Sequence, residues 1–212
     1  MAGELGRPLP KMETIEIISK KFDFPADKEG VVNLPFRRKV LAEFLKELNY
    51  KVGAEIGTDL GLFAETLCQS NPEMKLYCID PWRAYDKYED MKDQVRLNQN
   101  YFETQKRLAP YNCEILRESS TGALKHFPQR SLDFVYIDGN HAYEYVLEDL
   151  NGWSKVVKEG GIISGHDYRS DVSSHGKWDV TKAVKEYMAA HDIKTLYLFV
   201  RRYDSSWFFI NK

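Results

Sequence analysis

The stretch from Leu132 to Arg169, LDFVYIDGNHAYEYVLEDLNGWSKVVKEGGIISGHDYR, limits what this chain can fold into more than any other part of it. An apolar run ends at Asp138, a helix-length segment follows, and a second apolar run ends at His166 and Asp167. Two strands joined in this way pair in parallel through a right-handed crossover. Their carboxyl ends then meet at one edge of a sheet, where acidic side chains form a site suited to a metal ion.

The same alternation of strand and helix signals runs through most of the chain. Short apolar runs predict five strands, at residues 52–57, 75–80, 112–119, 132–138 and 160–167. Apolar residues at helical spacing predict helices between them, and the helix that contains Val146 is expected to end at Gly160 and Gly161. Two further runs, 195–202 and 206–212, flank a turn and predict an antiparallel hairpin. The expected fold is a three-layer α/β sandwich with a mostly parallel, seven-stranded sheet.

Composition and charge narrow the class of partner. The chain has 212 residues, of which 43% are hydrophobic, and this favours a single domain with a sizeable core. We expect this domain over residues 36–212, and an N-terminal extension over residues 1–35 that acts as a lid or as a homodimer contact. A formal net charge of −2 and a pI of 6.2 do not favour binding to nucleic acid or to an anionic membrane surface. Because the sequence shows no membrane span and no signal core, we expect a cytoplasmic protein that acts on small molecules.

The cysteines suggest no covalent framework. Cys68, Cys78 and Cys113 show no CxxC spacing, so neither a disulfide framework nor a zinc knuckle is expected. Cys78 and Cys113 fall inside strand-like runs and are interpreted as core residues.

A glycine-containing turn, EIGTDLG, follows the first of the predicted strands. Its pattern E-x-G-x-x-x-G places Gly57 and Gly61 where the backbone can approach a ligand and where the next helix offers free N–H donors. A tight strand-to-helix turn without a ligand would show the same glycines. Glu55 is harder to explain in that way, because a carboxylate near the end of an apolar strand needs a partner or a polar ligand group.

The next two strands also end in polar residues. Asp80 lies where a carboxylate can accept both hydroxyl hydrogens of an adenosine ribose, although a turn or N-cap aspartate would fit as well. Trp82 would place an apolar plane beside that ribose. Ser119 is expected either to contact an adenine ring or to cap the helix that begins near Thr121.

Taken in order, EIGTDLG, YCIDPW, DFVYIDGNHAYEYVLEDLNGW and EGGIISGHDY resemble the class I S-adenosylmethionine-dependent methyltransferases. Within them the chain is similar to the branch that contains the metal-dependent macrolide-sugar O-methyltransferases, and more distantly to the catechol-type O-methyltransferases. The resemblance covers roughly residues 40–190, and the block from IDGNHAY to HDY is its most diagnostic part. It implies a Rossmann-like methyltransferase sandwich.

The resemblance implies S-adenosyl-L-methionine as the cofactor. The residues that it assigns to the cofactor lie at or just after the ends of the first four predicted strands: Glu55, Gly57, Thr58, Gly61, Asp80, Trp82, Ser119 and Asp138. Among them, Glu55 and Gly57 would line the methionine part, Asp80 would hold the ribose hydroxyls, and Ser119 would lie near the adenine.

The resemblance also implies a divalent metal ion held by Asp138, His166 and Asp167. His166 stands where relatives carry an acidic residue, so the ligands would be nitrogen and oxygen atoms together. Mg²⁺ is the expected ion, and Mn²⁺, Fe²⁺ and Zn²⁺ are compatible with the same residues. His141 matches the position of a lysine general base in the catechol-type enzymes, so Asp138, His141 and His166 are the expected catalytic residues.

These residue types suit the transfer of a methyl group from a sulfonium to a hydroxyl. The displacement needs a hydroxyl placed in line with the methyl group and a base that removes its proton. A metal ion lowers the pKa of a bound hydroxyl, and a histidine with an ordinary pKa of about 6.5 can accept the proton at neutral pH. The expected acceptor is a small hydroxylated molecule, such as a sugar or a glycosylated natural product.

Other interpretations stay open on the sequence alone. The chain could be a metal-independent methyltransferase in which a histidine acts alone, or a module that binds S-adenosylmethionine without catalysis. A nicotinamide-dependent oxidoreductase is disfavoured, because Gly57 and Gly61 do not complete the pattern G-x-G-x-x-G.

Two loops are candidates for the rim of an acceptor site. The segment from Arg83 to Asn100 sets Tyr85 and Tyr88 among charges, as in a lid over a polar ring, although an amphipathic surface helix would fit as well. The second candidate rim comes from the loop after the fifth strand: Arg169, Asp171 and Trp178. The basic run Arg37–Lys39 is interpreted as a solvated face.

Overall fold

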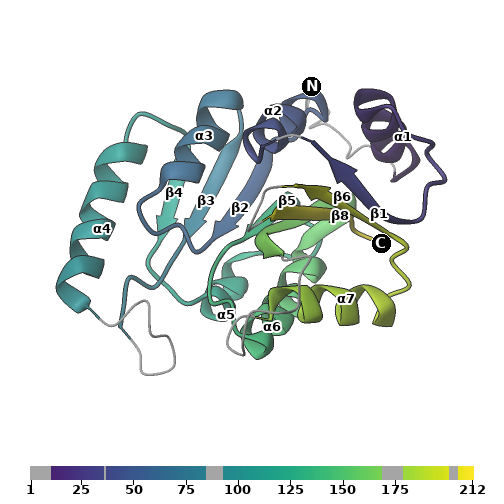
Figure 1. The fold of residues 1–212 in the computed structure, drawn as a ribbon. Coiled ribbons are helices and arrows are strands. Elements are labelled where there is room, and N and C mark those ends of the chain that lie inside the picture. The colour runs from purple at the N-terminus through teal and green to yellow at the C-terminus, as the bar shows by residue number, and fades with distance from the viewer. Residues whose placement is uncertain (1–10, 36, 85–92, 169–178, 201–204) are drawn as a thin grey trace.

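The computed structural model describes residues 11–35, 37–84, 93–168, 179–200 and 205–212. They form one eight-stranded sheet with helices on both faces (Figure 1). The strands are β1 (Gly30–Leu34), β2 (Val52–Ile56), β3 (Lys75–Ile79), β4 (Cys113–Leu116), β5 (Leu132–Ile137), β6 (Val157–Tyr168), β7 (Thr195–Phe199) and β8 (Ser205–Ile210). The helices are α1 (Lys11–Phe22), α2 (Lys39–Glu47), α3 (Leu62–Ser70), α4 (Gln94–Leu108), α5 (Ser120–Ala123), α6 (Tyr143–Val156) and α7 (Val180–Ala190), with a 3-10 turn at Leu124–His126.

The strand order is β1-β7-β8-β6-β5-β2-β3-β4. Among the described strands, only the pairs that include β8 are antiparallel, so β8 runs against all the others. The mostly parallel sheet and the antiparallel hairpin of β7 and β8 are thus confirmed. The expected number of seven strands is wrong, because β1 adds an eighth from the segment predicted to be an extension. Val32 and Leu34 alternate with exposed neighbours along β1, which is the pattern of an edge strand with one buried face.

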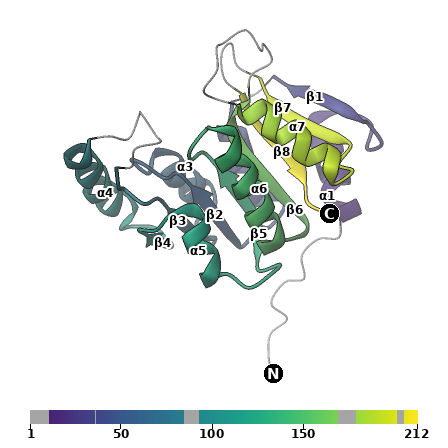
Figure 2. The same ribbon diagram turned by 90° about the horizontal axis from the view of Figure 1, so that it is seen from below.

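Helices cover both faces of the sheet and make three layers. α1, α2 and α3 lie on one face, and α5, α6 and α7 lie on the other (Figures 1 and 2). On β5, Phe134 and Tyr136 pack toward the first group of helices, and Val135 and Ile137 pack toward the second. Within the described ranges, none of these helices has both the length and the apolar character that crossing a membrane demands.

The N-terminal segment packs on the rest of the chain. Ile18 of α1 is fully buried in the same core as α2 and α3. The ring centroid of Phe22 lies 5.6 Å from that of Phe44, and Phe24 lies 5.5 Å from Tyr197. These three apolar side chains therefore have partners within the chain, and a lid or a dimer contact stays a prediction for this segment.

The predicted end of the helix before the fifth strand is wrong. α6 ends at Val156 and β6 begins at Val157, so Gly160 and Gly161 lie inside a strand instead of after a helix. The pairing of β6 with β5 is irregular at its beginning. A Cβ atom on Gly161 would lie 2.5 Å from the carbonyl oxygen of Asp133, so this glycine allows β6 to pass close to β5.

Candidate functional site

The strand order reverses between β2 and β5. From β2 the chain continues outward to β3 and β4, whereas β5 continues to β6 on the other side. Such a switch point leaves a crevice beyond the carboxyl ends of the strands, where open α/β sheets bind their ligands. A cavity of about 440 Å³ lies there. Its wall includes residues from three strand ends and two helices: Gly57, Asp59, Asp80, Ser119, Asp138 and Asp149.

Gly57 makes the first turn of this cavity. Its φ of +84° lies in the left-handed region that favours glycine. A Cβ atom at this position would lie 2.1 Å from the carbonyl oxygen of Asp138, because the turn crosses the end of β5. The glycine predicted to let a ligand approach is therefore also required by the contact of two backbone segments.

Asp80 lies directly after β3 and organises the same turn. Its Oδ2 accepts a hydrogen bond from the backbone N–H of Asp59 at 3.0 Å, and its Oδ1 accepts one from Trp82 at 2.7 Å. Burial raises the pKa of Asp80 to about 6, and these two hydrogen bonds oppose that effect. The carboxylate lines the cavity and keeps acceptor capacity for the hydroxyls of a ribose.

Trp82 and Ser119 both have roles within the fold. Trp82 is buried and is not among the described residues that line the cavity; its indole N–H donates to the carbonyl oxygen of Asp59 at 2.9 Å. Ser119 lines the cavity and caps α5, since its hydroxyl accepts a hydrogen bond from the N–H of Gly122 at 3.2 Å. Of the two roles expected for Ser119, the cap is confirmed, and the adenine contact stays a prediction.

Glu55 lies on β2 and Thr58 in the turn that follows it, and neither is among the described residues that line the cavity. Both are buried, and Oε2 of Glu55 and Oγ1 of Thr58 have no hydrogen-bond partner among the described residues. Burial raises the pKa of Glu55 well above its ordinary value, and the nearby negative charges of Asp138 and Asp80 add to the rise. Buried polar atoms without partners are uncommon, and a polar ligand group would satisfy them.

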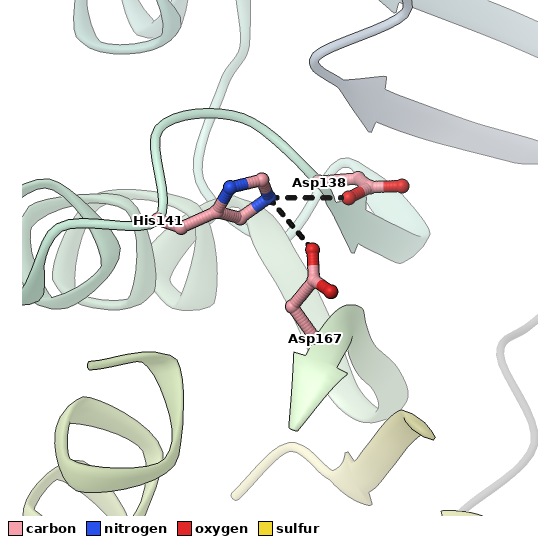
Figure 3. Close-up of side chains that lie close together, drawn as sticks. All are labelled: Asp138, His141 and Asp167. Atoms are coloured by element: carbon pink, nitrogen blue, oxygen red, sulfur yellow. Dashed lines mark ion pairs between the residues drawn. The ribbon is translucent and has the colours of Figure 1, made fainter. Parts of the chain in front are cut away.

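Asp138, His141 and Asp167 meet at the carboxyl edge of the sheet (Figure 3). Nε2 of His141 lies 2.9 Å from Oδ2 of Asp167 and 3.5 Å from Oδ1 of Asp138. One potential ligand atom from each residue falls within 4.8 Å of the others, close enough to hold one metal ion. Asp138 follows β5, Asp167 lies near the end of β6, and His141 lies in the loop before α6. The two carboxylates therefore meet at one sheet edge, as the sequence predicts.

Opposite charges hold this group together. Burial by itself lowers the pKa of His141, but its contacts with Asp138 and Asp167 outweigh burial and raise the pKa to about 9. Burial also opposes the ionisation of Asp167, yet its contacts with His141 and His166 hold its pKa well below the usual range. At neutral pH a protonated His141 consequently bridges two carboxylates.

His166 is buried beside this group but is not one of its three members. Its Nδ1 lies 3.5 Å from Oδ1 of Asp167, and its carbonyl oxygen accepts a hydrogen bond from the indole N–H of Trp207 at 3.0 Å. The group of three that could hold an ion therefore contains His141, whereas the ligand set implied by the resemblance contains His166, which lies beside Asp167. The role of His166 as a metal ligand stays a prediction. The loop through Gly139 and Asn140 brings the side chain of His141 back toward Asp138. The sequence separation of three residues between Asp138 and His141 does not by itself predict this contact.

Arg38 is a site residue that sequence reasoning missed. It precedes α2, and its Nη1 lies 3.6 Å from Oδ2 of Asp138. Its guanidinium lies over the ring of Phe63, 4.9 Å from the centroid. Burial lowers the pKa of Arg38, but Tyr136 and the charge of Asp138 raise it above its ordinary value. Its interpretation as part of a solvated face is wrong, since nothing in the spacing of a basic run shows which side chain turns inward.

The two candidate rims lie largely outside the described residues. This applies to the tyrosines of the first loop and to the whole second rim: Tyr85, Tyr88, Arg169, Asp171 and Trp178. Arg83, which begins the first loop, lines the cavity.

Asp149 of α6 is a buried carboxylate on the cavity wall that carried no signal in the sequence. The hydroxyl of Ser120 donates a hydrogen bond to it, and the same hydroxyl accepts one from the indole N–H of Trp153 at 2.8 Å. Burial raises the pKa of Asp149 to about 7, although the bond from Ser120 acts against the rise. The folded state therefore holds a proton on Asp149 more tightly than the unfolded chain does.

The stability of the fold should depend on pH through Asp149. Its contribution is fully present below pH 3.8, the ordinary pKa, and is lost as the pH rises through about 7. Asp149→Asn keeps the shape and the acceptor for Ser120 but cannot ionise. When the pH rises from about 5 to about 8, the wild type should lose about 2–3 kcal/mol of its free energy of unfolding through Asp149, and the variant should not show this loss. Urea unfolding at several pH values measures the difference. Equal pH dependence in the two proteins would contradict this.

Comparisons with known proteins agree with this geometry. Residues 54–168 match the family described as "Methyltransferase domain", and this match covers more than half of the chain. The chain therefore belongs to this family of methyltransferase domains. The three-layer fold and the cavity at the switch point are consistent with membership of this family.

Two solved structures illustrate the shared fold. An O-methyltransferase from Bacillus cereus in complex with SAH is 14% identical, with a TM-score of 0.62 and coverage of 99% of this chain and 94% of that one. The O-methyltransferase TomG from Streptomyces achromogenes, in complex with SAM, is 14% identical, with a TM-score of 0.59 and coverage of 99% and 93%. At these identities the likeness concerns the fold.

The curated relatives are longer than the segment they share with this chain. Uncharacterized protein R132 of Acanthamoeba polyphaga mimivirus is 30% identical over 116 residues, which cover 54% of this chain and 50% of that protein. Uncharacterized protein y4gI of Sinorhizobium fredii is 23% identical over 130 residues, which cover 58% of this chain and 13% of that protein. The chain thus spans half or less of the curated relatives that it matches.

Proposed function

We propose that this methyltransferase transfers a methyl group from S-adenosylmethionine to a hydroxyl of a small polar molecule, with the help of a divalent metal ion. The observation that carries the proposal is the position of Asp138, which both lines the cavity and belongs to the group with His141 and Asp167. A cofactor in the cavity and a hydroxyl at the acidic group would be neighbours.

The cavity offers the groups that the cofactor requires. Asp80 can accept hydrogen bonds from the ribose hydroxyls, and Ser119 lies on the wall where we place the adenine. We place the methionine part over the first turn, where Gly57 and Asp59 line the cavity, next in the chain to the buried Glu55 and Thr58. The cavity volume of about 440 Å³ is typical of small-molecule sites.

The donor atoms fit a divalent cation. Asp138 and Asp167 offer the hard oxygen ligands that Mg²⁺ prefers, and the imidazole of His166 beside Asp167 would make Mn²⁺, Fe²⁺ or Zn²⁺ compatible as well. When bound, such an ion supplies the positive charge that lowers the pKa of a hydroxyl. Arg38 contacts Oδ2 of Asp138, while Oδ1 faces His141, so the arginine orients this carboxylate.

We assign His141 as the general base. It accepts a proton only in its neutral form, and its raised pKa results from its contacts with Asp138 and Asp167. A divalent cation held by Asp138 and Asp167 would take up the negative charge that raises this pKa. His141 would then be neutral and able to accept the proton of the hydroxyl.

The acceptor that we propose is a small hydroxylated molecule, such as a sugar or a glycosylated natural product. TomG, which shares the fold, is an O-methyltransferase involved in tomaymycin synthesis, and this favours a small acceptor. The net charge of −2 offers no general attraction for a polyanion.

A chelation experiment tests the proposal. The purified protein is incubated with methyl-labelled S-adenosylmethionine and a panel of sugars, glycosides and catechols, and the labelled products are separated. We expect product with at least one acceptor, its loss in EDTA, and its return when excess Mg²⁺ or Mn²⁺ is added. Calorimetric binding of S-adenosylhomocysteine should persist in EDTA, because the cofactor wall and the acidic group share only Asp138.

Each other outcome points to a different interpretation. Full activity in EDTA would overturn the metal-assisted mechanism and leave a histidine as the sole catalytic base. If the protein binds the cofactor but methylates no acceptor even with metal present, the interpretation as a module that binds S-adenosylmethionine without catalysis would be favoured.

A further inference from the structure

The three cysteines lie on neighbouring elements and are not members of the acidic group. Cys68 lies in the last turn of α3, Cys78 on β3 and Cys113 at the start of β4. The sulfur atoms of Cys68 and Cys113 are 3.1 Å apart. Cys68 and Cys78 are buried, whereas Cys113 is partly exposed on an edge strand. Two cysteines that are far apart in the sequence are therefore neighbours in the fold.

We propose that Cys68 and Cys113 form a redox-active pair that closes to a disulfide when the protein meets hydrogen peroxide. An S–S bond is about 2 Å long, so the two sulfur atoms, now 3.1 Å apart, need to approach by about 1 Å. Cys78 is completely buried on β3 and stays reduced. The site is independent of the methyl-transfer function proposed above.

Cys113 is the thiol that reacts first, because it is the accessible member of the pair. Contacts with the thiols of Cys68 and Cys78 lower its pKa, which raises the fraction of nucleophilic thiolate. This thiolate attacks one peroxide oxygen, the O–O bond breaks, and hydroxide leaves, so that Cys113 becomes a sulfenic acid. The thiol of Cys68 then attacks that sulfur, the S–O bond breaks, and water leaves. In sum, two thiols lose two hydrogen atoms, and one peroxide becomes two molecules of water.

The disulfide would join α3 to β4 across a long loop. Such a link restricts the unfolded chain, so the oxidised protein should unfold at a temperature about 5–10 °C higher than the reduced protein. Reduction with dithiothreitol should reverse the shift.

Thiol counting and peptide mapping test the proposal on the intact protein. After treatment with hydrogen peroxide, thiol titration under denaturing conditions should find one free thiol instead of three. Protease digestion without reductant should yield one species that links the peptides of Cys68 and Cys113. Cys78→Ala should form the same link, and Cys113→Ala should not.

Three results would overturn the proposal. They are three thiols left after oxidation, a linked species that contains Cys78, and oxidation of Cys113 to a sulfinic acid without a link. Mapping of the wild-type protein decides between these outcomes even if Cys113→Ala fails to fold.

Discussion

Replacing Asp167 with asparagine should abolish metal binding while cofactor binding persists. The amide keeps the size of the side chain but removes the negative charge that a divalent ion needs and that pairs with His141 at 2.9 Å. We expect the affinity for Mn²⁺, measured by calorimetry, to fall at least about 100-fold, since even changes outside the ligands themselves cost 10–100-fold. Methyl transfer to an acceptor found in the panel should fall by about 10²–10⁴-fold, because the proton is no longer removed efficiently.

Asp27→Asn is the matched control, because it makes the same chemical change at an exposed carboxylate far from the site in sequence. It should leave the affinities for Mn²⁺ and for S-adenosylhomocysteine unchanged. If Asp167→Asn binds Mn²⁺ as the wild type does, Asp167 is not a ligand. If it loses S-adenosylhomocysteine as well, the two sites are not separable in the way that we propose.

Replacing Gly57 with alanine should destabilise the whole domain. The φ of +84° strains any side chain, and the new methyl group would lie 2.1 Å from the carbonyl oxygen of Asp138, which belongs to backbone and cannot turn away. The two effects together should lower the free energy of unfolding by about 3–5 kcal/mol. Because the same turn forms the cavity wall, S-adenosylhomocysteine should bind much more weakly to whatever protein remains folded.

Gly30 provides the control for this variant. Its φ of +87° is almost the same, yet a Cβ atom there would meet nothing within 4 Å. Gly30→Ala should therefore show only the conformational cost, about 1 kcal/mol, in urea unfolding at constant pH. Equal losses in the two variants would mean that the close contact between the turn at Gly57 and the backbone of Asp138 is not a steric constraint.

The parallel core of the fold follows from local patterns in the sequence. The strand β5 is buried on both faces, and β3 is buried on one face and half-buried on the other, so their sequences are mostly apolar. The helix-length segments between such runs enforce parallel pairing. The strand β1 has no such signal. Only Val32 and Leu34 are buried in it, and its place beside β7 depends on a partner about 165 residues later in the chain.

The sequence by itself determined which residues end the strands, and thereby that Asp80, Asp138 and Asp167 lie at one edge of the sheet. This follows because parallel strands bring their carboxyl ends together. Only the tertiary structure decided that His141 and not His166 completes the acidic group, that Arg38 turns toward Asp138, and that two cysteines 45 positions apart nearly touch. Such contacts depend on loop paths and side-chain directions, which are set by packing between distant segments and not by local spacing.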